Sequence, residues 1–245
     1  IIMKDLILKK PSRRKLIKII GLSVLGSASY GAFKILNENI VKTDWHGTVL
    51  NNPVKLSIHS NNNKNGLIIK QIEKFTHSVD NIFNLQNEES EIVKLNKDKI
   101  LKNPSESLIE VIQKSKIISK KTNGVFDISV QPLWDYYYNH FILEGNSHYP
   151  DNNKIKGVLS KVNWNHVKVG FDYIRLSNNA SITLNGIAQG WITDQITNIL
   201  KNNDIKNTLV DFGETYALGK YENTRPWNIL IKGSNNTNKI VSLTD

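Results

Sequence analysis

The sequence predicts an α+β fold in which a mixed or antiparallel sheet is covered by packed helices. Apolar and polar residues alternate around Val54, Leu56 and Ile58, as in a half-buried strand, whereas residues 68–82 place apolar side chains at helical spacing. Predicted helices and strands do not alternate strictly, which argues against a parallel α/β sheet. The 245 residues, 39% of them hydrophobic, allow one sizeable core or two small ones.

The elements in the first half of the chain follow from local signals. Residues 37–43 are expected to form a spacer, and the asparagine-rich residues 61–66 a loop. A second helix is predicted over residues 105–122, because its apolar residues share one face and Asn123-Gly124 supplies a stop. A short helix is predicted after Asp151, which is a favoured N-cap residue.

The second half of the chain predicts a hairpin, a helix and two more strands. Residues 173–177 and 181–184 are predicted strands, and Asn178-Asn179 between them is typical of a hairpin turn. Residues 190–202 have apolar residues at helical spacing. The last predicted strands are 208–212 and 227–231.

The composition excludes several classes of protein. Charged residues make up 22% of the chain and the mean hydropathy is -0.35, which excludes a protein with many membrane spans and a fully disordered chain. The chain has no cysteine, so it has no disulfide framework, zinc–thiolate site or cysteine nucleophile.

The positive charge is concentrated at the N-terminus. Residues 1–18 contain seven basic residues and one acid, so they carry +6 of the formal net charge of +10. A basic chain ordinarily favours nucleic-acid binding, but here most of the excess lies in one terminal segment. We therefore expect no nucleic-acid partner.

Residues 1–36 are expected to be a twin-arginine-type export signal or anchor. The segment Ser12-Arg13-Arg14-Lys15-Leu16-Ile17-Lys18 matches the twin-arginine pattern, and the uncharged residues 19–33 follow it. This uncharged run is shorter than the about 20 residues that a membrane-spanning helix needs. An ordinary secretory signal or an uncleaved anchor helix stays open. We expect the twin-arginine machinery to export the chain to the periplasm or the outer face of the cytoplasmic membrane, with membrane contact only through this segment.

Asp127 is the first candidate functional residue. It follows the predicted helix stop at Asn123-Gly124 and lies between Phe126 and Ile128, where an acid needs a partner because burying a lone charge is costly. It is either a ligand contact in a loop or a capping residue, and the residues alone slightly favour the cap.

Two glycine-containing turns are the other candidates. Residues 183–194 run from a predicted strand through Asn185-Gly186 into a helix, and such a turn exposes backbone N–H groups where phosphate binds well. Its spacing fits neither the P-loop nor the dinucleotide fingerprint, so tight packing of strand on helix explains it equally well. Residues 209–219 place Glu214 after a strand, where it could hold a neighbouring backbone, contact a ligand or be solvated.

The three segments around Asp127, Gly186 and Glu214, taken in their order along the chain, resemble one family. This family is the FAD:protein FMN transferases, or ApbE-like flavin transferases. The resemblance begins at Trp45-His46-Gly47-Thr48, continues through residues 83–96, and includes Gly124–Asp127, Thr183–Asp194 and Asp211–Gly219. It implies that residues 37–245 form an ApbE-like flavin transferase domain with the fold of that family. Members of the family are typically exported, which agrees with the leader.

The resemblance implies a Mg²⁺-dependent enzyme. Such an enzyme takes FAD as its substrate, transfers the FMN half to a Thr or Ser hydroxyl of a target flavoprotein, and releases AMP. The metal neutralises the pyrophosphate while the hydroxyl attacks in line. The implied partner is an exported or membrane-anchored electron-transfer flavoprotein that carries the Thr or Ser flavinylation motif.

The resemblance also implies roles for individual residues. Val125, Phe126 and Asp127 match FAD contacts, and Gly186 matches a position whose backbone oxygen helps to hold Mg²⁺. Four positions near FAD carry a different residue type from many members: His46 instead of Met, Gln86 instead of Tyr, Thr183 instead of Asp, and Gln189 instead of Lys or Glu. These differences affect individual contacts more than the fold.

The family pattern predicts a longer chain. Members continue with a His-His-Ile-Ile-Asp-Pro-like segment and an Asp-x-x-x-Thr segment that supplies most of the metal ligands, and neither is present before Asp245. On this pattern, the domain lacks its C-terminal metal-binding part, and the catalytic base is expected beyond Asp245. The 245-residue chain is then expected not to transfer FMN.

Two alternatives to the flavin transferase stay open at this point. The first is an exported FAD-binding module without catalysis, or a decayed fragment. The second is an unrelated exported solute-binding protein, which the ordered motifs disfavour. The DNA downstream of Asp245 would separate the enzyme from the first alternative, because an in-frame continuation of the family pattern restores the enzyme, whereas a stop codon supports the binding module or a decayed gene.

Overall fold

The computed structural model describes residues 40–60, 63–233 and 237–244. Residues from Val41 onward form one compact unit, which is described here by itself. The predicted leader, residues 1–36, lies outside the described residues, as does the beginning of the predicted spacer. Within the described part of the chain, no helix combines the length and the apolar character needed to cross a membrane.

A four-stranded antiparallel sheet is the centre of this unit. Its strand order is β1-β2-β6-β7, with β1 at Val41–Val49, β2 at Asn52–Ser60, β6 at Thr208–Asp211 and β7 at Thr215–Leu218. The predicted strand around Val54 is confirmed. The predicted spacer is wrong for residues 41–43, because they pair with residues 58–60 of β2 and so extend β1. This pairing partner is distant enough in the sequence that local composition does not reveal it.

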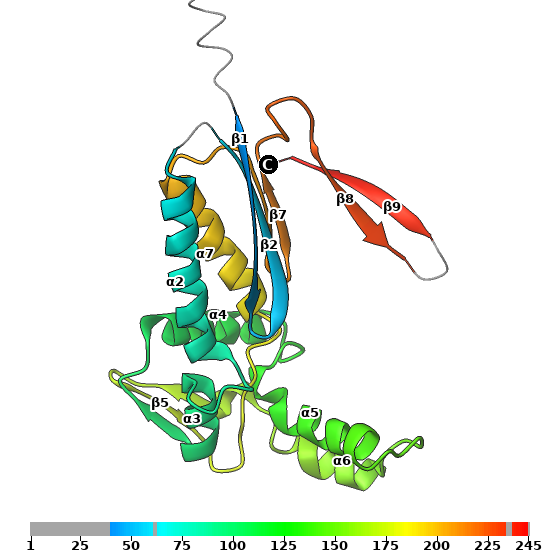
Figure 1. The fold of residues 1–245 in the computed structure, drawn as a ribbon. Coiled ribbons are helices and arrows are strands. Elements are labelled where there is room, and N and C mark those ends of the chain that lie inside the picture. The colour runs from blue at the N-terminus through cyan, green and yellow to red at the C-terminus, as the bar shows by residue number, and fades with distance from the viewer. Residues whose placement is uncertain (1–39, 61–62, 234–236, 245) are drawn as a thin grey trace, which may run out of the picture. The chain divides into compact units, whose positions relative to one another are not determined.

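Two long helices cover one face of the main sheet (Figure 1). They are α2 (Asn65–Phe83) and α7 (Ala188–Asn202), which contact each other as well as the strands. Their apolar stripes pack on the inward side chains of β2 and β6, such as Leu56, Ile58 and Val210, all at most 2% exposed. Burial of these stripes is the main source of stability here, since helix propensity alone is weak.

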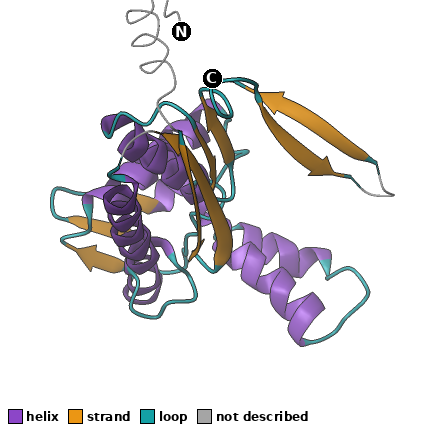
Figure 2. Cartoon of the chain, turned by 45° about the horizontal axis from the view of Figure 1, so that its top comes forward, coloured by secondary structure: helices purple, strands orange, loops and turns teal. Residues whose placement is uncertain are grey.

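The remaining elements surround this two-layer core. They are α3 (Glu91–Asp98), β3 (Ile100–Lys102), α4 (Glu106–Lys121), α5 (Gln131–Tyr138), α6 (Asn152–Leu159), β4 (Val167–Val169), β5 (Tyr173–Leu176), β8 (Trp227–Lys232) and β9 (Asn238–Leu243), with short 3₁₀ or π turns at Ile128–Val130, Asn139–Leu143 and Trp164–His166. The views in Figures 1 and 2 both show α5 and α6 side by side, away from the main sheet. Strands β3, β5 and β4 form a second sheet, and β8 pairs with β9.

Several other predicted elements are confirmed, but the predicted hairpin is wrong. The helices over residues 105–122 and 190–202 are present as α4 and α7, and Asp151 caps α6. The predicted hairpin from residues 173–177 to residues 181–184 is absent, because β5 pairs instead with β3 and β4. Residues 181–184 do not form a strand.

A side chain replaces the missing strand partner of residues 181–184. The Asn96 side chain accepts the Ile182 N–H at 2.7 Å and donates to the Ile182 carbonyl at 2.8 Å, so it mimics a neighbouring strand. The Thr183 N–H then donates to the carbonyl of Ile128 at 2.8 Å. These contacts fix the segment that leads into α7.

Candidate functional site

The N-terminus of α7 presents unpaired backbone donors. The Ile187 and Ala188 N–H groups both donate to the carbonyl of Leu184, which starts the helix. The next two N–H groups, of Gln189 and Gly190, have no hydrogen-bond partner among the described residues. Free N–H groups at a helix N-terminus, together with the helix dipole, favour an anion.

The two glycines of this turn line an open cavity of about 550 Å³. A Cβ on Gly186 would lie 3.5 Å from Cε2 of Phe126, and one on Gly190 would lie 4.0 Å from Cγ of Glu214, which are ordinary contacts. Neither glycine has a positive φ. Tight packing therefore does not require glycine at either position, which favours the ligand-binding interpretation of the turn over the packing one.

The three sequence segments meet around this turn. Phe126 of the first segment lies against Gly186 of the second, and the Gln189 side chain lies against Gly213 of the third. The Glu214 side chain is near Gly190 and lines the same cavity, while its backbone oxygen accepts a long hydrogen bond of 3.5 Å from Thr193 Oγ1. Glu214 therefore both holds a neighbour through its backbone and lines the cavity.

Helix α4 forms the opposite wall of the cavity. It contributes Lys114, Ile117 and Ile118, and α7 adds Asp194. Lys114 forms an ion pair of 2.8 Å with Glu110, and its hydrogen bond holds the pKa of the Glu110 carboxyl below the usual range. Sequence reasoning missed Lys114, and it included Asp194 in the segment 183–194 without naming it as a site residue, because nothing in the local pattern of either helix distinguishes a cavity wall from a solvated face.

Asp127 has a capping role, as the residues alone slightly favoured. One carboxylate oxygen accepts the backbone N–H and the hydroxyl of Ser129, at 2.8 and 2.7 Å, and caps a 3₁₀ turn. The other accepts the Trp164 N–H at 2.9 Å. Its predicted contact with FAD stays a prediction. The neighbouring Val125 is 90% exposed, so its side chain has no part in the core.

Thr183 lies beside a second, mostly apolar cavity of about 350 Å³. Its hydroxyl accepts the Asn185 N–H at 3.3 Å, which shapes the turn before Gly186. Trp134 and Tyr137 of α5 line the same cavity. The structure thus places Thr183 next to the turn but on the side of α5.

His46 lies on the face of the main sheet that α2 and α7 do not cover. It is exposed on β1, in a row with Lys55 of β2 and Asp211 of β6, and the three line a shallow cavity of about 250 Å³. The structure therefore brings His46 together with Asp211 of the third segment. The residues that line this cavity and those around Gly186 are different sets.

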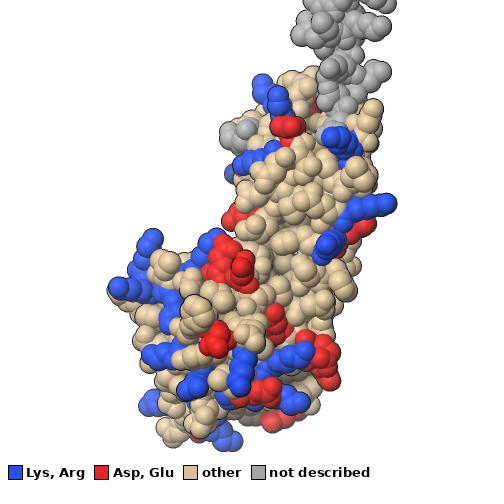
Figure 3. Space-filling model, turned by 90° about the vertical axis from the view of Figure 1, so that its left-hand side faces the viewer, with Lys and Arg blue, Asp and Glu red and all other residues tan. Residues whose placement is uncertain are grey.

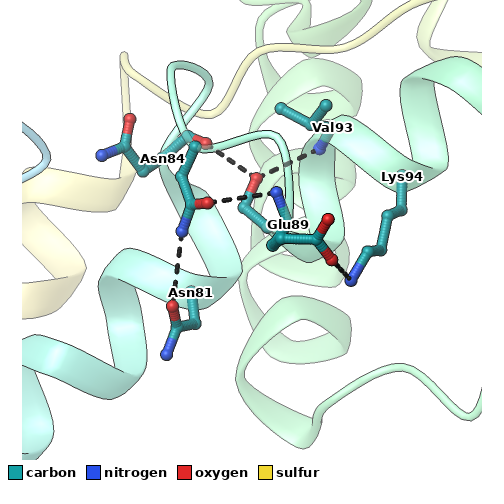
Figure 4. Close-up of polar contacts among 7 residues, drawn as sticks. Asn81, Asn84, Glu89, Val93 and Lys94 are labelled. Atoms are coloured by element: carbon teal, nitrogen blue, oxygen red, sulfur yellow. Dashed lines mark hydrogen bonds and ion pairs between the residues drawn. The ribbon is translucent and has the colours of Figure 1, made fainter.

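Gln86 lies next to the turn between β1 and β2. Its side-chain oxygen accepts a hydrogen bond from Asn51 at 2.5 Å. The loop that carries it is fixed by hydrogen bonds around Asn84 and Glu89 (Figure 4), where Ser90 Oγ donates to the Asn84 carbonyl at 2.7 Å and caps α3. Gln86 is not among the residues that line the cavity at Gly186.

The described residues do not form a complete magnesium site by themselves. The Gly186 carbonyl accepts no hydrogen bond from the described residues, and Asp194 and Glu214 line the same cavity. However, no group of three or more His, Cys, Asp or Glu side chains that could hold a metal is present in residues 40–60, 63–233 and 237–244. Mg²⁺ prefers near-octahedral oxygen coordination, which these groups alone do not supply.

The surface charge gives no single-signed patch on the face shown in Figure 3. Acidic side chains lie among the basic ones over much of that face.

Solved structures of ApbE proteins have the same fold, and the titles of two of the three described here call the protein a flavin transferase. The apo form of the Pseudomonas stutzeri flavinyl transferase ApbE matches with a TM-score of 0.71 at 17% identity, over 84% of this chain and 67% of that one. The Vibrio cholerae flavin transferase ApbE matches with a TM-score of 0.70 at 17% identity, over 84% and 70%. The ApbE protein of Thermotoga maritima matches with a TM-score of 0.68 at 20% identity, over 83% and 68%. At these identities the likeness shows the fold.

The sequence itself identifies the family. No curated protein matches the chain by sequence. The model of the ApbE family matches residues 42–245, which is nearly the whole of the compact unit and includes all three segments around Gly186. The α+β fold, the predicted resemblance and the family match agree, and this chain belongs to the ApbE family.

Proposed function

We propose that this chain is a flavin transferase that takes FAD and transfers its FMN half to a Thr or Ser hydroxyl of an exported flavoprotein. The single observation that carries the proposal is the turn before α7. Its two glycines are required neither by packing nor by backbone conformation, and they line a cavity beside free N–H donors. Membership of the ApbE family supports the same function.

The pyrophosphate of FAD would occupy the N-terminus of α7. The N–H groups of Gln189 and Gly190 are available as donors there, and the absence of side chains at Gly186 and Gly190 lets the phosphates approach the backbone. The carboxylates of Asp194 and Glu214 repel phosphate, so we place them toward the hydroxyl and amino groups of the ligand rather than toward its anionic centre.

The reaction is a phosphoryl transfer with a protein hydroxyl as the nucleophile. The acceptor oxygen forms a bond to the phosphorus of the FMN half, the bond from that phosphorus to the oxygen of AMP breaks, and the hydroxyl proton leaves to a base. Mg²⁺ is proposed as the cofactor, with the Gly186 carbonyl as one ligand. The described residues do not complete a site for this metal by themselves.

The location and partners of the chain are also proposals. The twin-arginine pattern at Arg13-Arg14 supports export by that machinery to the periplasm or the outer face of the membrane. The acceptor would then be an exported or membrane-anchored electron-transfer flavoprotein with a Thr or Ser target motif.

Covalent flavin transfer tests the proposal directly. The full-length gene product is incubated with FAD, MgCl₂ and an acceptor protein that carries the Thr target motif, and the acceptor is then examined for in-gel flavin fluorescence after denaturation. A fluorescent acceptor with equimolar AMP release supports the proposal, and the same acceptor with Thr→Val should stay dark. Tight FAD binding without transfer would instead identify a non-catalytic FAD-binding module, and no FAD binding would refute both functions.

A further inference from the structure

We infer that Gly213 is a positioning residue, which sets the place of the Gln189 amide at the N-terminus of α7. The two residues come from different segments of the sequence, one from the turn after β6 and the other from the first turn of α7. Gly213 would not contact the ligand in this role but would act through Gln189. The inference rests on the proposed function, because it assigns Gln189 to FAD binding.

A side chain at Gly213 would have to displace the Gln189 amide. A Cβ there would lie 2.6 Å from Cδ, 2.8 Å from Oε1 and 2.9 Å from Nε2 of Gln189. These distances are shorter than any ordinary contact, so the Gln189 amide occupies the space that a side chain at residue 213 would fill. Gly213 also has a φ of +93°, which other L residues rarely adopt.

The turn that contains Gly213 is fixed from both sides. The Phe212 N–H donates to the Glu214 carbonyl at 3.2 Å, and the Phe212 side chain is 2% exposed. Its ring stacks on that of Trp45, with 5.9 Å between the centroids. Because the backbone is held in this way, a new side chain at Gly213 would move the Gln189 side chain rather than the turn.

The Gln189 amide is available to a ligand. Its side-chain oxygen and nitrogen have no hydrogen-bond partner among the described residues, although the side chain is half-buried. An amide offers two donors and one acceptor, so packing alone holds this group in place beside the free N–H groups of the helix start. A polar group held by packing and left without a protein partner at a cavity is suited to a ligand with its own donors and acceptors.

FAD affinity in a double-mutant cycle tests the inference. The full chain is prepared as the wild type, Gly213→Ala, Gln189→Ala and the double variant, and FAD dissociation constants are measured by calorimetry, with thermal unfolding of each. Gly213→Asn is a second variant, because Asn tolerates a positive φ and still displaces the amide. Gly145→Ala is the matched control, since Gly145 has a φ of +67° and a Cβ there meets nothing within 4 Å.

We expect Gly213→Ala, Gly213→Asn and Gln189→Ala each to weaken FAD binding about three- to tenfold, as for one lost neutral hydrogen bond. The double variant should bind FAD no more weakly than Gln189→Ala alone, and Gly145→Ala should bind like the wild type. Wild-type affinity in a folded Gly213 variant, or penalties that multiply in the double variant, would overturn the inference while leaving the proposed function intact. A wild-type chain that does not bind FAD would overturn both.

Discussion

The carboxylate of Asp127 accepts the backbone N–H of Trp164, which lies 37 residues later in the chain, at 2.9 Å. The other oxygen of the same carboxylate caps the 3₁₀ turn that begins at Ile128. Asp127 thus joins the segment after α4 to the segment before β4. Phe126, the residue before Asp127, places its ring beside Gly186. The hydrogen bond from Trp164 to Asp127 therefore helps to hold the part of the chain that lies against the candidate site.

Asp127→Ala should lower the free energy of unfolding by about 1.5–3 kcal/mol, as expected when a hydrogen-bonding charged group is removed from a half-buried place. The measurement is urea unfolding followed by circular dichroism. Asp98→Ala, at an exposed position on α3, is the control and should change stability by less than about 0.5 kcal/mol. Unchanged stability together with weaker FAD binding would mean that Asp127 acts mainly on the ligand.

Gly186→Ala should leave stability nearly unchanged but weaken FAD binding. The new methyl group would meet only Phe126, at 3.5 Å, so the fold should tolerate the substitution. The methyl group would, however, lie at the cavity that Gly186 lines. Gly157→Ala in α6 is the control, since a Cβ there meets nothing within 4 Å and the residue lies in another helix. Calorimetry with FAD and thermal unfolding separate the two effects, and equal FAD affinity for both variants would remove Gly186 from the binding site.

Protonation of His59 should destabilise the fold at low pH. Burial lowers the pKa of His59 below its ordinary value of 6.5, and the side chain is only 1% exposed. Its Nδ1 accepts the Glu222 N–H at 3.2 Å, so the neutral ring is the form that fits. As pH falls, the histidine is protonated in the unfolded state before it is protonated in the folded state. The contribution of the neutral His59 to the free energy of unfolding is therefore complete above about pH 6.5 and decreases below it.

Urea unfolding from pH 5 to pH 8 measures this effect. In His59→Gln, the free energy of unfolding should depend less on pH than in the wild type. His77→Gln, at an exposed position on α2, is the control and should show the same pH dependence as the wild type. A wild-type slope that survives in His59→Gln would assign the pH dependence to other groups.

Lys99→Met should destabilise the segment before α7. The Lys99 ammonium donates to the carbonyls of Asn96 and Ala180 and to the hydroxyl of Ser181. Burial lowers the pKa of Lys99, and the three oxygens offset part of the cost of burying its ammonium group. Loss of the Lys99 ammonium and its hydrogen bonds should lower the free energy of unfolding by about 1–3 kcal/mol.

Hydrogen exchange at Ile182 provides the second readout for Lys99→Met, since the Ile182 N–H donates to the Asn96 side chain. The exchange should accelerate in Lys99→Met and stay slow in the exposed control Lys102→Met. Equal protection in both variants would show that Asn96 fixes this segment without the lysine.

Replacing both Arg13 and Arg14 by Lys should abolish export. The exchange keeps the charge of the leader, so an ordinary secretory signal would tolerate it, whereas the twin-arginine machinery reads the arginine pair. The measurement is a fusion of residues 1–36 to a reporter that is exported only when folded. The control is single replacement of Lys9 by Arg, which leaves the arginine pair intact and should not affect export. Undiminished reporter activity outside the cytoplasm in the double variant would reject the twin-arginine assignment.

The sequence by itself determined the fold class, most helices and the family. Helical spacing predicted α2, α4 and α7, and the N-cap residue Asp151 predicted the start of α6. These signals can be read from the sequence because they depend on neighbours three or four residues away. The order of the motifs around Gly186 was sufficient to indicate the ApbE family.

Only the tertiary structure decided the rest, because the deciding partners are far away in the chain. Residues 41–43 form a strand since they pair across the sheet, and residues 181–184 are not a strand since the Asn96 side chain takes the place of a neighbour. The same reason explains Gly213, which lies in the turn between β6 and β7: the space where its side chain would stand is filled by the Gln189 amide from α7, a contact that no local pattern encodes. Long-range packing, which propensity and spacing do not capture, thus decides these positions.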